Sequence, residues 1–287
     1  MSAKRNIRQV LGMNMLRLFV LVVLFFLGFI LWDVFSKGVG VINGEFLGGF
    51  PRKGMTEGGI FPAIMGTIFV TFVTTIFAIP FGIAAAIYLS EYAVENALNR
   101  LIRAAIRNLA GVPSIIYGLF GVAIFVRGFG FDTSILSAGL TLGLLTLPYI
   151  ITTTEEALKN VPYSYREGSL ALGATKWEAI RTNVLPSAVS GIVTGAILGL
   201  SRAAGETAPI LFTGAAFYLR YLPGSIFDEF MALPYHLYIL STQHHAIAEV
   251  RPLAYGTGVV LLSLVFVLNI IAFIIRYRYR NFNKSRI

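Results

Sequence analysis

Two charged side chains inside an apolar segment carry most of the chemistry that this sequence offers. Arg202 and Glu206 lie four residues apart within residues 186–212, where most other side chains are apolar or small. An arginine at bilayer depth costs roughly 2.5–3.5 kcal/mol on insertion scales, so it normally faces a protein interior or a wet cavity. Its planar fork of donors suits an oxyanion, and the neighbouring Thr207 hydroxyl could add a contact. The segment predicts an anion pathway, with an ion pair that only locks two helices as the alternative.

Helical spacing places small residues on the same face as the charges. At about 100° per residue, one stripe roughly 80° wide holds Gly191, Gly195, Gly199, Arg202 and Glu206. Small residues four apart allow another helix to approach closely, so the glycines are predicted to pack against a neighbour. Pro209 follows and favours an interrupted helix that lines a cavity.

The elements that must position these residues are membrane helices. Of 287 residues, 56% are apolar and only 13% are charged, which is too little charge to cover the surface of a soluble domain. A helix that crosses the hydrocarbon core needs about 20 mostly apolar residues. Six segments qualify, so the sequence predicts an all-α polytopic membrane protein with spans at 15–35, 61–89, 109–126, 134–152, 186–212 and 253–275.

The placement of basic residues predicts the orientation. Sixteen of the 23 Lys and Arg residues lie on one side of the six spans, so both termini are expected to be cytoplasmic and the protein to be a multi-pass protein of the cell membrane. The excess charge therefore reports topology, not nucleic-acid binding. No small-residue cleavage site follows the first span, which is predicted to be a retained anchor. The chain divides into an anchor region (1–59), a core (60–276) and a basic tail (277–287).

Several classes of chemistry have no matching residues. The sequence has no cysteine, no phosphate-binding glycine motif and no nucleophile paired with a base at depth, so we expect no catalytic residues and no bound ATP. His236, His244 and His245 lie in the outer segment 214–252 and are expected to be solvated loop residues that hold no metal. That segment could also contain a short interfacial helix.

The polar segment at 155–185 is long and amphipathic for a simple connector. Its spacing is similar to the cytoplasmic motif E-A-A-x3-G-x9-I-x-L-P of ABC-importer permeases, on the residues Glu167, Gly168, Ser169, Gly173, Leu185 and Pro186. The chain departs from that motif at Gly168 and Ser169, which replace two alanines, and at Asn183, which replaces the isoleucine. An ordinary solvated connector is the alternative.

Two further segments make the resemblance more specific. GVPSIIYGLFG (111–121) and SRAAGETAPILFT (201–213) resemble phosphate ABC-transporter permeases of the A type (PstA-like), and the similarity runs from the second span to the C-terminus. The resemblance implies the type I importer permease fold and a second, PstC-like permease subunit. It also implies two cytoplasmic ATPases that carry ATP and Mg and receive the loop helix of residues 167–173, an extracytoplasmic phosphate-binding protein, and no cofactor in this chain.

These features predict a membrane permease subunit that moves inorganic phosphate into the cytoplasm. Arg202 would bind the anion, and Glu206 would either neutralise Arg202 in the empty pathway or accept a hydrogen bond from a protonated phosphate oxygen, which sulfate lacks. One alternative is an ABC permease for another oxyanion, such as molybdate or sulfate. A secondary transporter would require internal repeats and several midplane acids, and a membrane-embedded enzyme would require catalytic groups.

Overall fold

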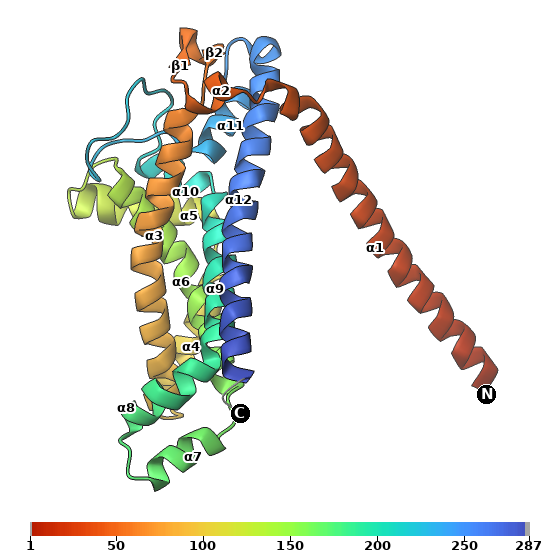
Figure 1. The fold of residues 1–287 in the computed structure, drawn as a ribbon, viewed down its shortest axis with the longest axis vertical. Coiled ribbons are helices and arrows are strands. Elements are labelled where there is room, and N and C mark those ends of the chain that lie inside the picture. The colour runs from red at the N-terminus through yellow and green to blue at the C-terminus, as the bar shows by residue number, and fades with distance from the viewer. Residues whose placement is uncertain (1, 285–287) are drawn as a thin grey trace.

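The apolar segments fold into long helices that run side by side (Figure 1). The computed structural model describes residues 2–284. Its helices are α1 (Ser2–Gly38), α2 (Gly44–Gly48), α3 (Phe61–Ile87), α4 (Ala97–Leu109), α5 (Ser114–Gly121), α6 (Ile135–Lys159), α7 (Ser164–Ala171), α8 (Lys176–Ala179), α9 (Leu185–Ala204), α10 (Ala208–Thr213), α11 (Leu233–Thr242) and α12 (Ile247–Lys284). The π-helical segments η3 (Tyr88–Tyr92), η4 (Val122–Gly128) and η5 (Ile180–Val184) extend these helices, and the short elements are η1 (Val39–Val41), η2 (Lys53–Met55), β1 (Pro51–Arg52) and β2 (Glu57–Gly58).

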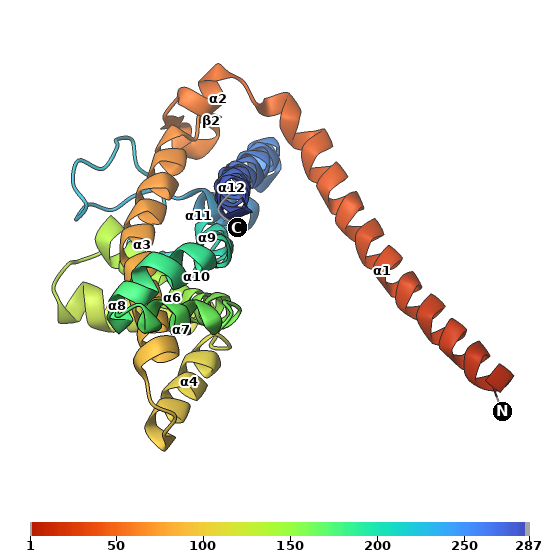
Figure 2. The same cartoon turned by 60° about the horizontal axis from the view of Figure 1, so that its bottom comes forward.

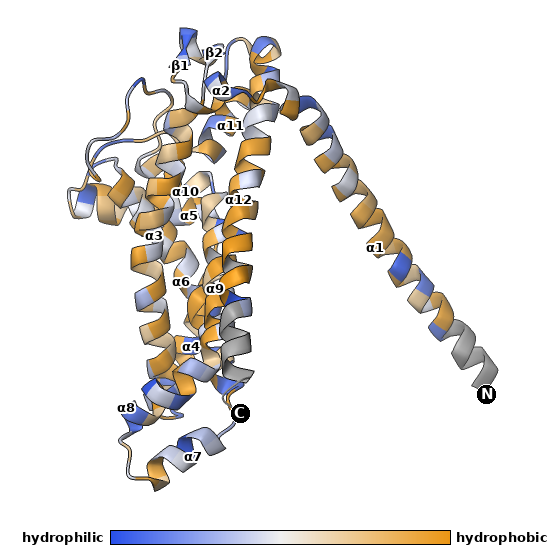
Figure 3. Cartoon of the chain, in the orientation of Figure 1, coloured by the Kyte–Doolittle hydropathy of each residue, from blue (hydrophilic) through white to orange (hydrophobic). Residues whose placement is uncertain are grey.

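The structure matches the predicted all-helical membrane architecture. Within residues 2–284, five helices are long and apolar enough to cross a membrane, and a sixth span results if the pair α4 and α5, bent by 104°, is counted as one. Figure 3 shows apolar residues along the lengths of α1, α3, α9 and α12, with polar residues gathered beyond both ends of the bundle. We call these the α7 end and the α11 end. The N-terminal end of α1 and the C-terminal end of α12 both point towards the α7 end (Figure 1).

Among the predicted boundaries that differ from the structure are those of the third span and of the basic tail. The third span was expected to begin at residue 109, but a sharp turn follows α4 and helix α5 begins at Ser114. Helix α12 continues through residues 277–284 of the predicted basic tail. Residues 285–287 of that tail lie outside the described residues.

Helix α6 lies at the centre of the bundle. Two-thirds of its most apolar 18-residue stretch is buried, the largest share among the spanning helices of the described chain. Glycines on α6 receive side chains of α3: a Cβ added at Gly139 would lie 2.5 Å from Val73, and one at Gly143 would lie 2.4 Å from Phe77. Thr74 also donates to the Gly139 carbonyl at 3.1 Å. Small residues thus bring the two backbones close together, as is usual in membrane helix packing.

Two of the three histidines at the α11 end are not the solvated loop residues that the sequence predicted, whereas His245 is exposed in a turn, as predicted. His244 is 3% exposed; its Nε2 donates to the Gly54 carbonyl at 2.7 Å, and its Nδ1 accepts from the Ala246 amide at 3.0 Å. His236 lies in α11 and is also 3% exposed. Burial, and to a smaller extent the nearby His244, lowers the pKa of His236 to about 4. The expectation failed because His244 fastens the β1–β2 hairpin to the rest of the molecule.

Helix α1 diverges from the other helices, as both views in Figures 1 and 2 show. It meets α12 at the α11 end, where Gly38 packs against Tyr255 and the Tyr255 hydroxyl donates to Asp33 at 3.1 Å. No residue of its most apolar 18-residue stretch is buried by the rest of the chain. The bundle of α3 to α12 is therefore built without α1.

Candidate substrate pathway and coupling segment

The predicted fifth span is interrupted beside its charged pair. Helix α9 ends at Ala204, and Gly205, Glu206 and Thr207 form a break before α10. Pro209 explains the break, because its ring would clash with the carbonyl of residue 205 in a continuous helix. The prediction that Glu206 lies on the same helical face as Arg202 was therefore wrong: Arg202 is in the last turn of α9, and Glu206 lies beyond the end of that helix.

The two charges nevertheless face each other across the break. Arg202 Nε lies 3.4 Å from Glu206 Oε1, while the Arg202 side chain is 58% exposed and that of Glu206 is 17% exposed. A cation in the last turn of a helix is stabilised by the carbonyl end of the helix dipole. Within the described residues, Nε is the only guanidinium nitrogen of Arg202 with a hydrogen bond to a side chain, so the outer edge of the guanidinium remains available to bind an anion.

Helix α5 packs against the start of α10, directly after the break. A Cβ added at Gly118 would lie 3.1 Å from both the Ala208 carbonyl and Pro209 Cα. The segments 111–121 and 201–213, distant in the sequence, thus form one structural unit at the break.

The glycines before the pair lie against α6. A Cβ added at Gly191 would lie 2.6 Å from Ala157 Cβ, and one at Gly195 would lie 2.0 Å from Thr153 Oγ1. At Gly199 the nearest side-chain atom would be 3.5 Å away, which is ordinary contact. The approach of α9 to α6 is therefore closest at Gly191 and Gly195 and looser towards Arg202.

The segment with the importer motif forms a helical hairpin at the α7 end. Helix α7 is followed by a turn in which Gly173 adopts φ +84°, a conformation that favours glycine. The chain then enters α8 through a capping box in which Thr175 and Glu178 bond to each other's backbone amides. Glu167 and Gly168 are exposed, and Leu172 at the tip is 91% exposed. Leu185 and Pro186 begin α9, so the hairpin leads directly into the helix that bears Arg202.

Two of the positions that depart from the importer motif contact each other. Asn183 Nδ2 donates to Ser169 Oγ at 2.6 Å, and Ser169 is 8% exposed. This hydrogen bond fixes α7 against η5.

Sequence reasoning missed a buried ion pair that holds α7 to the bundle. The Arg166 guanidinium binds both oxygens of Glu91 at 3.0 and 2.6 Å, and it donates to the Leu158 and Val161 carbonyls at 3.0 Å. The side chains of Glu91 and Arg166 are only 6% and 14% exposed. One arginine at the start of the hairpin thus joins the end of α3 to the end of α6. The sequence offered no pairing signal, because the two residues lie in different elements.

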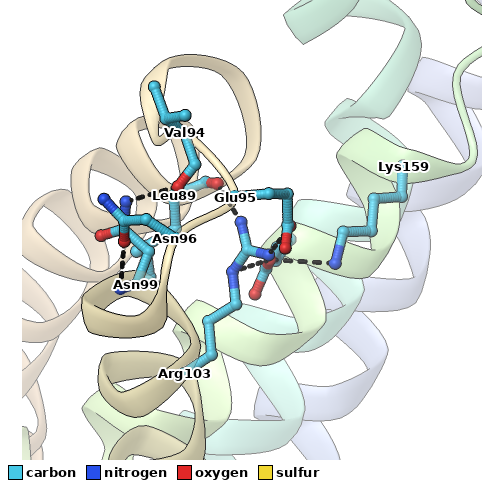
Figure 4. Close-up of polar contacts among 8 residues, drawn as sticks. Leu89, Val94, Glu95, Asn96, Asn99, Arg103 and Lys159 are labelled. Carbon is cyan, nitrogen blue, oxygen red and sulfur yellow. Dashed lines mark hydrogen bonds and ion pairs between the residues drawn. The ribbon is translucent and has the colours of Figure 1, made fainter.

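A second cluster at the same end was also missed (Figure 4). Arg103 of α4 contacts the carboxylate of Glu155 at 3.1 Å and that of Glu95 at 2.7 Å, while Lys159 contacts Glu155 at 2.9 Å. Glu155 is 7% exposed and lies near the end of α6. In the sequence, Arg103 counted only as one of the sixteen basic residues on one side of the spans.

Comparison with known families decides the class of the protein. The family model for the binding-protein-dependent transport system inner membrane component matches residues 78–281, well over half of the chain. The chain belongs to this family. The match includes the hairpin, the glycine face of α9 and the break at Arg202. A permease component of this kind is a transport subunit and not itself an enzyme.

Sequence relatives of this permease component cover most of its length. The phosphate transport system permease protein PstA 1 of Mycobacterium tuberculosis is 31% identical over 96% of this chain and 91% of its own length. The PstA protein of Yersinia pestis is 36% identical over 88% and 85%, and the probable ABC transporter permease YqgI of Bacillus subtilis is 32% identical over 83% and 85%.

Solved structures show the same fold at lower sequence identity. A chain of a bacterial alginate ABC transporter, crystallised with its pentasaccharide-bound periplasmic protein, is 15% identical with a TM-score of 0.68 over 94% of both chains. A chain of the inward-facing MetNI methionine ABC transporter is 21% identical, with a TM-score of 0.61 over 76% of this chain and 94% of that one. The fold is that of type I ABC-importer permeases.

Proposed function

We propose that this permease component moves inorganic phosphate into the cytoplasm, driven by ATP hydrolysis on partner chains. The observation that carries the proposal is the exposed Arg202 at a break between two membrane helices. A guanidinium of this kind suits phosphate, which carries between one and two negative charges near neutral pH. The names of the relatives support phosphate over other oxyanions.

The α7 end is cytoplasmic in this proposal. The basic residues concentrate at that end, as expected from the positive-inside rule. Both chain termini would then be cytoplasmic, and the β1–β2 hairpin and α11 would face the extracytoplasmic binding protein.

Arg202 and Glu206 together bind and discriminate the anion. The free edge of the Arg202 guanidinium donates to phosphate oxygens, and the Thr207 hydroxyl beside it adds a donor. Glu206, which already contacts Arg202 at 3.4 Å, neutralises the arginine in the empty pathway and accepts a hydrogen bond from the protonated oxygen of monohydrogen or dihydrogen phosphate in the filled one. Sulfate has no proton to offer, so the carboxylate repels it.

Partner chains complete the pathway. A half-exposed arginine within the membrane requires a protein or water neighbour, which a second, PstC-like permease subunit would supply. The hairpin tip, with Leu172 exposed, enters a groove of a cytoplasmic ATPase. Two ATPase chains bind ATP and Mg, and their closure moves the hairpin and with it α9.

Transport by the complete complex in cells lacking other phosphate importers tests the proposal. Arg202→Ala should lower the uptake of radiolabelled phosphate by roughly 10- to 100-fold, the cost of losing a charged hydrogen-bond donor, while the ATPase still co-purifies. Arg127→Ala, which removes an exposed arginine from η4, is the matched control and should transport normally. Loss of assembly in Arg202→Ala would instead assign Arg202 to a structural ion pair. Inhibition by sulfate or molybdate as strong as that by unlabelled phosphate would identify a different oxyanion as the substrate.

A further inference from the structure

Helix α4 has two unlike faces that the transport function does not use. By helical geometry, its apolar side chains cover an arc of about 100° made of Leu98, Leu101, Ile102, Ala105 and Leu109. Arg100 and Arg107 lie together on the opposite side, close to 160° from the centre of that arc. A short helix with one apolar and one basic face is typical of a helix that lies in a membrane surface.

The third face of α4 is fixed to the bundle, which sets the direction of the other two. Arg103 reaches Glu155 of α6, and the buried Asn99 donates from Nδ2 to the Val94 carbonyl at 2.8 Å (Figure 4). Asn96 caps the start of the helix by accepting from the Asn99 amide. Because α4 cannot turn about its axis without breaking these contacts, its apolar and basic faces have fixed directions.

Those two faces have no partner within the described part of the chain. Leu98 and Leu101 are 63% and 66% exposed. Arg100 and Arg107 are exposed, and no ion pair to either is formed by residues 2–284. Arg103 of the same helix differs, because it forms ion pairs with Glu95 and Glu155, whereas Arg100 and Arg107 form none within the described residues.

The position of α4 agrees with a membrane surface. It lies at the end of the bundle that holds the charged clusters and projects sideways from it (Figure 2). Its axis is bent by 104° from that of the pair's second helix, α5 with η4, which follows α4 in the chain, so α4 does not share their direction. A helix across the ends of spanning helices has one side towards hydrocarbon and the other towards headgroups.

We infer that α4 lies in the headgroup layer of the cytoplasmic leaflet and binds anionic phospholipid through Arg100 and Arg107. The apolar arc enters the acyl region, and the two guanidiniums bind lipid phosphates as bidentate donors. The inference takes from the proposed function only the orientation of the bundle and makes no use of phosphate transport. An anionic lipid is favoured over a protein partner because the two exposed charged groups of α4 that form no ion pair within the described residues, Arg100 and Arg107, are both cationic.

Spin labelling can test this, because the sequence contains no cysteine to remove. Leu98→Cys places a nitroxide on the apolar arc, and Glu57→Cys places one on the exposed β1–β2 hairpin, outside the bundle. The full chain, purified with the subunits that accompany it, is reconstituted in nanodiscs of phosphatidylcholine with or without phosphatidylglycerol. Oxygen reaches a label in acyl chains, whereas a water-soluble nickel chelate reaches a label in solvent. Both measurements are independent of transport, so a failed phosphate assay would not alter them.

We expect the label at residue 98 to be accessible to oxygen and shielded from nickel, most strongly with phosphatidylglycerol, and the label at residue 57 to be accessible to nickel in both lipids. Arg100→Gln with Arg107→Gln should weaken the docked state by roughly 25-fold, about fivefold for each arginine, and reduce co-purified phosphatidylglycerol. Lys176→Gln with Arg181→Gln removes the same charge from exposed residues of α8 and η5 and should leave the label at residue 98 unchanged.

Three results would overturn the inference. Shielding of residue 98 from both reagents would mean that a protein subunit covers α4. Access to nickel in both lipids would mean that the helix is solvated. Oxygen access that neither phosphatidylglycerol nor the arginine variants alter would mean that α4 enters the membrane without recognising anionic lipid.

Discussion

The Asn183 amide donates to the Ser169 hydroxyl at 2.6 Å, and both residues stand where the importer motif has an apolar side chain. In the motif, alanine and isoleucine at these positions would pack against each other across the same α7–η5 contact. The chain therefore replaces an apolar contact with a polar one at the base of the hairpin. Each of the two substitutions depends on the other, because a lone polar group at this contact would lose its partner.

The pair predicts strong non-additivity between two mutations. Ser169→Ala alone should destabilise the hairpin by about 1 kcal/mol, since Asn183 loses its partner. Ser169→Ala with Asn183→Ile, which restores the motif, should recover that loss. Thermal unfolding of the purified chain, combined in a double-mutant cycle, measures the coupling. Simple addition of the two single effects would show that the hydrogen bond does not contribute.

The buried pair of Glu91 and Arg166 predicts a much larger effect. Glu91→Gln leaves a guanidinium that is only 14% exposed without its carboxylate, which should cost about 3–5 kcal/mol. The Tm of the chain should fall clearly, and the ATPase should co-purify poorly because α7 loses its attachment to α3. Glu57→Gln breaks an exposed pair with Lys53 at 2.7 Å and should leave Tm unchanged. Equal Tm values for both variants would contradict the anchoring role of Arg166.

Glu206→Gln tests the origin of oxyanion selectivity. The variant keeps a side chain of the same size beside Arg202 but removes the negative charge that repels sulfate. We expect sulfate competition against phosphate uptake to increase by about tenfold. Assembly with the ATPase serves as the control for folding. Unchanged discrimination between the two anions would leave Glu206 only as the counter-ion of Arg202.

The glycines of the chain predict opposite outcomes for two alanine substitutions. Gly195→Ala would place Cβ 2.0 Å from Thr153 Oγ1 and should destabilise the chain by about 1–3 kcal/mol through overpacking between α6 and α9. Gly168→Ala on α7 meets nothing within 4 Å and should stabilise that helix by about 0.5–1 kcal/mol. Tm measurements on both variants check the prediction. A stable Gly195→Ala variant would show that α9 can move away from α6 at little cost.

His236 predicts a stability that depends on pH. Because burial lowers its pKa to about 4 from a usual value near 6.5, the unfolded chain takes up a proton between these values and the folded chain does not. Stability should be constant above pH 6.5 and fall by about 3 kcal/mol as the pH drops towards 4. His236→Phe should remove much of that fall in Tm. A wild-type protein with constant Tm over the interval would show that His236 is protonated in place.

The spanning helices could be predicted from the sequence because hydropathy depends on local composition. The same property hid the break at Gly205, since apolar residues continue on both sides of it in α9 and α10. Pro209 correctly indicated that the helix is interrupted, but it did not show at which residue the helix ends. The helical-wheel prediction therefore assigned Glu206 to the same helix as Arg202, although that helix ends at Ala204.

The polar contacts between distant elements could not be predicted in the same way. His244 binds a carbonyl 190 residues earlier in the chain, and Arg166 binds a carboxylate 75 residues earlier. Nothing in the neighbourhood of either residue reports its partner. Burial of His236 likewise follows from the packing of α11 against α12 and α3, which no property of segment 214–252 specifies.

The helical path from α8 to the end of α9 is unbroken from Lys176 to Ala204. Among its glycines, the closest contacts with α6 are at Gly191 and Gly195, and the midpoint of these two is about 25 Å from Lys176 and about 14 Å from Arg202 at 1.5 Å per residue. If this helix moves as a rigid body, it pivots at Gly191 and Gly195, where its backbone lies directly against α6 because glycine has no side chain. A push on α8 would therefore displace Arg202 in the opposite direction by about half as much.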